Sequence, residues 1–168
     1  MNNNDIRGTS RPHRLHGGST GRSAWRWLTA VVLVHLVVSI VHGTAHSWAH
    51  VPLSRAANLF VFGVIVAGPL IGLAVALALA DARIGSWVIA ITMAGALVFG
   101  CANHFVLAGP DHVSQVAERW RPMFTMTAAL LAAIEGLATA LAIHIARGGD
   151  DRVPTARVGD DVSATPRG

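Results

Sequence analysis

Four histidines recur about once per helical turn along an apolar segment near the start of the chain. Residues 27–51 are otherwise almost entirely apolar and contain His35, His42, His46 and His50. At about 100° per residue, a helix would place these four side chains within a sector of about 80°. An ionisable side chain inside an apolar helix is costly, and it usually marks a functional site. The segment therefore predicts a helix with one histidine-rich face turned toward the protein interior.

The spacing of these histidines predicts a metal site. His42 and His46, like His46 and His50, are four residues apart, which puts two imidazoles on neighbouring turns of one helix face. Imidazole binds iron, zinc and copper, and a carboxylate ligand shifts the preference toward non-haem iron or zinc. We predict a transition-metal site built from His42, His46, His104 and Glu135, with His50, His112 and Asp111 as further candidate ligands. Asn58, Asn103 or Asp111 would orient the rings by hydrogen bonding. These residues do not assign an enzymatic activity.

The composition indicates that membrane-spanning helices carry these residues. The chain of 168 residues is 52% hydrophobic and only 13% charged, about half the charge of an ordinary soluble domain. Its apolar residues form four blocks, each long enough for the roughly 20 residues that cross a bilayer core. The blocks are Leu28–His50, Ala56–Ala80, Ser86–Ala108 and Met123–Ala146. Because a chain this short cannot close a barrel from such blocks, they must be helices.

Short connections between these blocks predict antiparallel neighbours, and hence an all-α integral membrane protein built as an up-down-up-down four-helix bundle. Pro52 ends the first helix, because the residue before a proline is pushed out of the α conformation. Ser54 is a candidate N-cap for the second helix, and Pro69 predicts a kink within it. We also predict a short interfacial helix from Pro110 to Trp120, in the outer loop between helices three and four.

The arginines predict the orientation of the bundle. All 13 basic residues are arginines, and ten of them lie before the first span, between spans two and three, or after span four. By the positive-inside rule, both termini are cytoplasmic in a multi-pass protein of the cell membrane. We therefore divide the chain into a disordered tail over residues 1–24, a transmembrane domain over 25–147, and a disordered tail over 148–168. This topology explains the basic charge, so nucleic acid is not an expected partner. The expected partners are the bilayer and a membrane redox partner or a second copy of the chain.

The same orientation predicts where the polar residues meet. His42, His46 and His50 fall in the outer half of the first helix, while His104 falls near the outer end of the third. Glu135 lies near the middle of the fourth helix. We therefore expect the histidine site in the outer half of the bundle, where it could also be redox active.

Three alternative functions use the same residues. In a b-type haem membrane cytochrome, haem is held by histidines on facing helices, here His42 or His46 with His104, and His35 with His144. In a proton-coupled transporter, Glu135 would join the histidines in a relay. In an accessory subunit, the polar residues would bind a partner helix.

Overall fold

The computed structural model describes residues 20–148, and this range contains helices, turns and loops but no strand. Four helical rods in it are long and apolar enough to cross a membrane, as predicted. They are α1 (Thr20–Trp48), then α2 (Arg55–Phe60) continued by η1 (Val61–Ala67) and α3 (Gly68–Leu79), then α4 (Ala82–Cys101) continued by η2 (Ala102–Val106), and finally α5 (Arg121–Gly148). Most of the two predicted tails lies outside the described residues.

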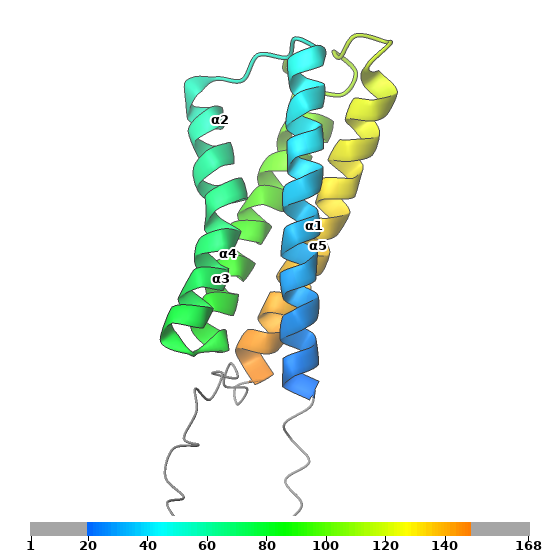
Figure 1. The fold of residues 1–168 in the computed structure, drawn as a ribbon. Helices are drawn as coiled ribbons and strands as arrows, with labels where there is room; N and C mark the ends of the chain where they lie inside the picture. Colours follow the sequence, from blue (N-terminus) through cyan, green and yellow to red (C-terminus); the bar gives the residue numbers. More distant parts are fainter. Residues whose placement is uncertain (1–19, 149–168) are drawn as a thin grey trace, which may run out of the picture.

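The four rods lie side by side, with their connections at alternate ends. Segments 49–54 and 107–120 lie at one end, and the turn at Ala80–Asp81 lies at the other, where the described chain also begins and ends (Figure 1). We call these the two-loop end and the termini end. α5 packs against both α1 and α4, and α3 packs against α4. Near the two-loop end, α2 stands apart from α1 (Figure 1).

The second rod departs from regular α-helix just before Pro69, the residue at which the sequence predicts a kink. Ser54 caps α2 as expected, because its Oγ accepts a hydrogen bond from the Ala57 N–H at 3.1 Å. Pro69 has no N–H and its ring crowds the preceding turn, so the ordinary helical ladder cannot continue through it. The chain adopts the wider π-helical form over Val61–Ala67 and returns to α-helix at Gly68. Such π segments often mark functional sites.

Toward the termini end, the rods form a tightly packed apolar core. Leu28, Val32, Ile89 and Met93 are fully buried in it. α3 and α4 approach closely because Gly72 faces Gly85; a Cβ on Gly72 would lie 2.9 Å from the Gly85 carbonyl oxygen. The interior of this half is therefore mostly apolar, with the buried Ser86 as an exception, and the buried histidines and carboxylates lie beyond it.

The short helix predicted between Pro110 and Trp120 does not form. The segment is a series of turns, with hydrogen bonds such as the Gln115 N–H to the His112 carbonyl at 2.8 Å. Two tertiary contacts compete with a surface helix. The Val113 N–H donates to the His104 carbonyl at 3.0 Å, and Val116 is buried in a cluster with Phe124. The segment consequently folds in over the end of the bundle.

Candidate metal centre

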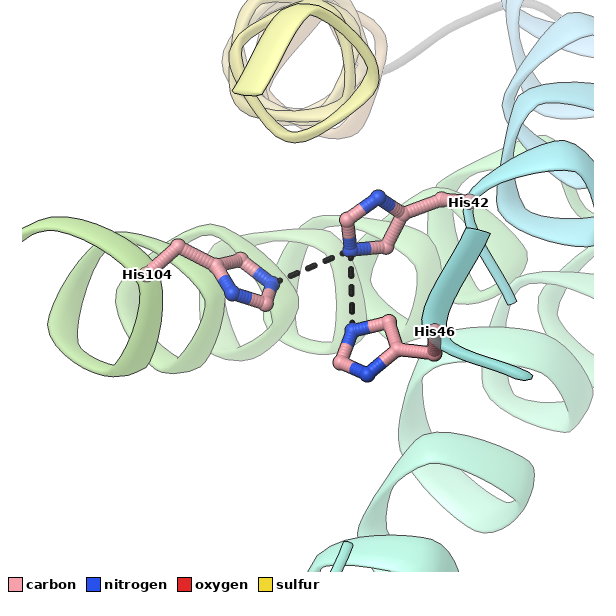
Figure 2. Close-up of side chains that lie close together, drawn as sticks. All are labelled: His42, His46 and His104. Carbon is pink, nitrogen blue, oxygen red and sulfur yellow. Dashed lines mark hydrogen bonds between the residues drawn. The ribbon is translucent and has the colours of Figure 1, made fainter. Parts of the chain in front are cut away.

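Three buried histidines meet near the two-loop end. His42 and His46 come from successive turns of α1, and His104 comes from η2 across the bundle (Figure 2). Their candidate ligand atoms all lie within 4.8 Å of one another. The His42 Nε2 atom lies 3.2 Å from Nε2 of His104 and 3.2 Å from Nε2 of His46. All three residues are more than nine-tenths buried. We call these three residues the histidine trio; they lie close enough to bind one metal ion.

The outward nitrogens of two of these rings have hydrogen-bond partners. His104 Nδ1 is 3.1 Å from the Asp111 main-chain carbonyl, which can only accept, so this nitrogen carries the proton. His42 Nδ1 is 2.8 Å from Thr127 Oγ1. The Thr127 hydroxyl also lies within hydrogen-bonding distance of the carbonyls of Met123 and Phe124; when its single proton goes to one of them, its oxygen accepts from His42 Nδ1–H. Ligating histidines commonly show this pattern, with the second ring nitrogen donating to a fixed acceptor.

A neutral imidazole with its proton on Nδ1 has only a lone pair on Nε2. When both His42 and His104 are in this form, two lone pairs face each other at the centre of the trio. With the His42 proton on Nε2 instead, the same 3.2 Å contact is the hydrogen bond drawn in Figure 2. In the first form, a cation between the nitrogens removes the repulsion of the lone pairs. Two nitrogens bound at 2.0–2.1 Å to a tetrahedral ion are about 3.3 Å apart, close to the observed separation.

Phe124 and Asp111 border the trio. The Phe124 ring centroid lies 4.9 Å from that of His42, 4.7 Å from His46 and 5.3 Å from His104, so it covers one side of the cluster. Asp111 Oδ1 lies 3.3 Å from His46 Nε2 and 3.5 Å from His104 Nδ1. Neither approach has hydrogen-bonding geometry, which leaves this buried oxygen without a donor among the described residues. Asp111 caps no helix and is instead a carboxylate next to the trio.

Glu135 is not part of the trio but faces the same cavity. Its Oε1 lies 3.2 Å from Nε2 of His35, and both side chains are buried. The cavity, of about 80 Å³, is lined by the trio and Asp111 as well as by Glu135. Glu135 Oε2 and His104 Cδ2 each lie 4.0 Å from the point where a Cβ on Gly100 would be. The absence of a side chain at Gly100 thus helps to keep the cavity open between them.

The other sequence candidates lie elsewhere. His50 is exposed just after the end of α1, and His144 is exposed on the last turns of α5. His112 is half-buried and hydrogen-bonds Ser114 at 2.7 Å. Asn58 and Asn103 donate to the carbonyls of Leu53 and Phe99 in their own segments, so neither orients a histidine ring. The structure brings together the trio and Asp111, and it places Glu135 across the cavity with His35.

Two residues of the site were missed by the sequence reasoning: Thr127, which fixes His42, and Phe124, which covers the rings. A signal for Thr127 exists, because Thr127, Leu131 and Glu135 follow one another at intervals of four and share a face of α5. Phe124 has no comparable signal among the phenylalanines of the chain.

No protein-family model, curated protein or solved structure matches this chain. Its chemistry therefore has to be argued from its own residues. Over residues 20–148, the fold and the site define an all-helical chain with four helices long and apolar enough to span a membrane and a buried three-histidine cluster that can hold a metal ion.

Proposed function

We propose that this chain is an integral membrane protein of the cell membrane that binds one transition-metal ion through His42, His46 and His104. The observation that carries the proposal is the convergence of the Nε2 atoms of His42 and His104, which lie 3.2 Å apart while the opposite nitrogen of each ring has a hydrogen-bond partner. In the proposed arrangement the helices cross the membrane up-down-up-down, both termini are cytoplasmic, and the trio lies in the outer half.

The donor set favours particular metals. Three imidazoles suit zinc, iron and copper, whereas magnesium and calcium prefer oxygen ligands. Three protein ligands leave a coordination position open, as in catalytic rather than purely structural sites. In this protein the open position would face the cavity that Glu135 and Asp111 line. A bound metal would act there as a Lewis acid or an electron carrier.

The geometry does not favour haem at these histidines. Axial ligands lie on opposite sides of a haem iron, whereas the Nε2 atoms of His42 and His104 converge at 3.2 Å beside a cavity of about 80 Å³. The two histidines of the second candidate haem pair lie in different surroundings, because His35 is fully buried against Glu135 and His144 is exposed. A mononuclear non-haem centre fits the residues better.

Metal analysis tests the proposal directly. The full chain should be purified in mild detergent without a polyhistidine tag, loaded separately with Zn²⁺, Fe²⁺ or Cu²⁺, and passed through a desalting column. We expect about one equivalent of at least one of these metals to stay bound to the wild-type protein, and His104→Ala to lose most of it.

The matched control is His144→Ala, which removes an exposed histidine from the same chain and should retain the metal of the wild type. The proposal is wrong if no metal is retained by the wild type, or if His104→Ala and His144→Ala retain equal amounts. A proton shared by the two rings would then account for their close approach.

A further inference from the structure

The cavity beside the trio is larger than a metal ion alone requires. It has a volume of about 80 Å³, enough for several water-sized groups. Its walls between the polar ends are mostly apolar and include Ile65, Phe99 and Leu131. An aliphatic and aromatic wall of this kind favours an organic molecule over bulk water.

Two carboxylate oxygens that line the cavity have no donor among the described residues. One is the Asp111 Oδ1 described above. The other is Glu135 Oε2, on the side of Gly100 and His104; Glu135 is 3% exposed, and its Oε1 contacts His35. A carboxylate oxygen with little access to water is strongly stabilised by a hydrogen-bond donor. A molecule in the cavity can supply the donor that Glu135 Oε2 lacks.

The cavity reaches the surface between α1 and the second rod. Gly43 lines it and is itself exposed, and a Cβ built on Gly43 meets no atom within 4 Å. Across from Gly43 the wall is formed by Val61 and Ile65 of η1. Gly43 and Ile65 both belong to the apolar spans, Arg22–Trp48 and Arg55–Leu79. In a membrane, this opening would face the acyl chains rather than water.

We infer that the cavity takes up, sideways from the bilayer, a lipid-soluble phenol. Its hydroxyl donates to Glu135 Oε2, its ring lies against Phe99 and the aliphatic walls, and its apolar substituent extends past Gly43 into the lipid. The inference deepens the proposed function and rests on it in one respect: the bound phenol would lie beside the open position of a metal held by the trio. The hydroxyl contact with Glu135 and the entry at Gly43 do not require the metal.

A binding experiment tests this with 4-heptylphenol and, as the ligand control, heptylbenzene, which has the same chain and ring but no hydroxyl. Both are titrated into the full-length protein in lipid nanodiscs, with and without bound Zn²⁺, and the melting temperature is recorded. We expect a saturable rise with 4-heptylphenol only. Glu135→Gln should weaken the apparent affinity about tenfold or more, because a hydrogen bond to a charged acceptor is lost.

The entry route is tested with a matched pair of variants. Gly43→Phe fills the opening, and Gly63→Phe adds the same side chain at another exposed glycine with open space around it, away from the cavity lining. Gly43→Phe should abolish the 4-heptylphenol effect, and Gly63→Phe should leave it unchanged.

Equal responses to the two ligands, no saturable response in the wild type, or equal responses of the two glycine variants would overturn the inference. Water alone would then fill the cavity. Metal content, measured on the same samples, reports separately on the proposed function: phenol binding to a wild type that retains no Zn²⁺, Fe²⁺ or Cu²⁺ would reject the metal centre and keep the phenol site.

Discussion

The hydrogen bond from His42 to Thr127 gives the trio its chemical character at the scale of single residues. When His42 Nδ1–H donates to Thr127 Oγ1, Nε2 is left as a lone pair directed at the other two rings. Partners of this kind raise metal affinity by fixing the ring in its ligating form and orientation. The residue that supplies the acceptor should thus matter for metal binding without touching the metal.

Thr127→Val, which keeps the shape and removes the hydroxyl, is expected to weaken metal binding about 10–100-fold. A competition titration with a chelating dye measures this. Thr139→Val is the matched control, because Thr139 makes the same kind of bond to a carbonyl of its own helix, at 2.7 Å to that of Glu135, and does not contact a histidine of the trio. If both variants bind metal as the wild type does, the Thr127 hydroxyl does not orient the ring.

Acidification should release the metal. Each imidazole must be neutral to offer its lone pair, so protons and the metal compete for the same nitrogens. The metal affinity should therefore fall, and not rise, as the pH falls, and the same titration repeated at decreasing pH measures this. An affinity that rises on acidification would contradict binding by the trio.

How far the sequence predicts the site depends on how local each contact is. The four-residue spacing is enough to place His42 and His46 on one helix face. The topology is enough to bring His104 near them. The pairing of Glu135 with His35 could not be predicted, because it depends on the relative height and rotation of α5 and α1, which side-chain packing decides.

At the scale of elements, the ends of two rods depend on residues in a left-handed conformation. α3 ends at Ala80, which has φ of 50°, and the Asp81 N–H bonds back to the Ala76 carbonyl at 3.2 Å. α1 ends the same way around His50, with φ of 54° and the Val51 N–H bonded to the His46 carbonyl at 3.1 Å. Glycine usually occupies such positions, because a Cβ is strained there.

Ala80→Gly is accordingly expected to stabilise the protein by about 0.5–1 kcal/mol, seen as a higher midpoint of thermal unfolding in mild detergent. The control is Ala74→Gly, at an exposed position within α3, which should destabilise by about the same amount because glycine costs helical order. If Ala80→Gly stabilises the protein and Ala74→Gly destabilises it, the backbone conformation at each position is the cause. Destabilisation by both substitutions would refute it.

Local signals predict element ends well and fail where tertiary contacts compete. Ser54 acts through its own hydroxyl, and Pro69 through its ring and its missing N–H, so the cap forms where expected and the chain departs from regular α-helix just before the proline. The segment from Gly109 to Trp120 has only a weak helical pattern. The carbonyl of His104 and the burial of Val116 outweigh that pattern and produce turns.

At the scale of the whole molecule, the polar and apolar interiors are separated along the bundle axis. The trio, Asp111 and the His35–Glu135 pair occupy the part toward the two-loop end, while residues such as Leu28 and Met93 fill the part toward the termini end. The hydropathy of the sequence predicts the four rods, because each is a continuous apolar block. With the proposed orientation, the apolar half would close the site off from the cytoplasm and leave the two-loop end as the approach for a metal ion.

Labelling of single cysteines in intact cells tests that orientation. Cys101 is the only cysteine of the chain, so Cys101→Ala provides a background for Ser114→Cys, in the segment at the two-loop end, and Gly148→Cys, at the end of α5; both positions are exposed. Because ten of the 13 arginines of the sequence come before the first span, between spans two and three or after the fourth span, a membrane-impermeant maleimide should label Ser114→Cys in intact cells and Gly148→Cys only after permeabilisation. The reverse labelling pattern would show that the bundle has the opposite orientation, with the trio toward the cytoplasm. In that orientation metal would be supplied from the cell interior, and the chain would not follow the positive-inside rule.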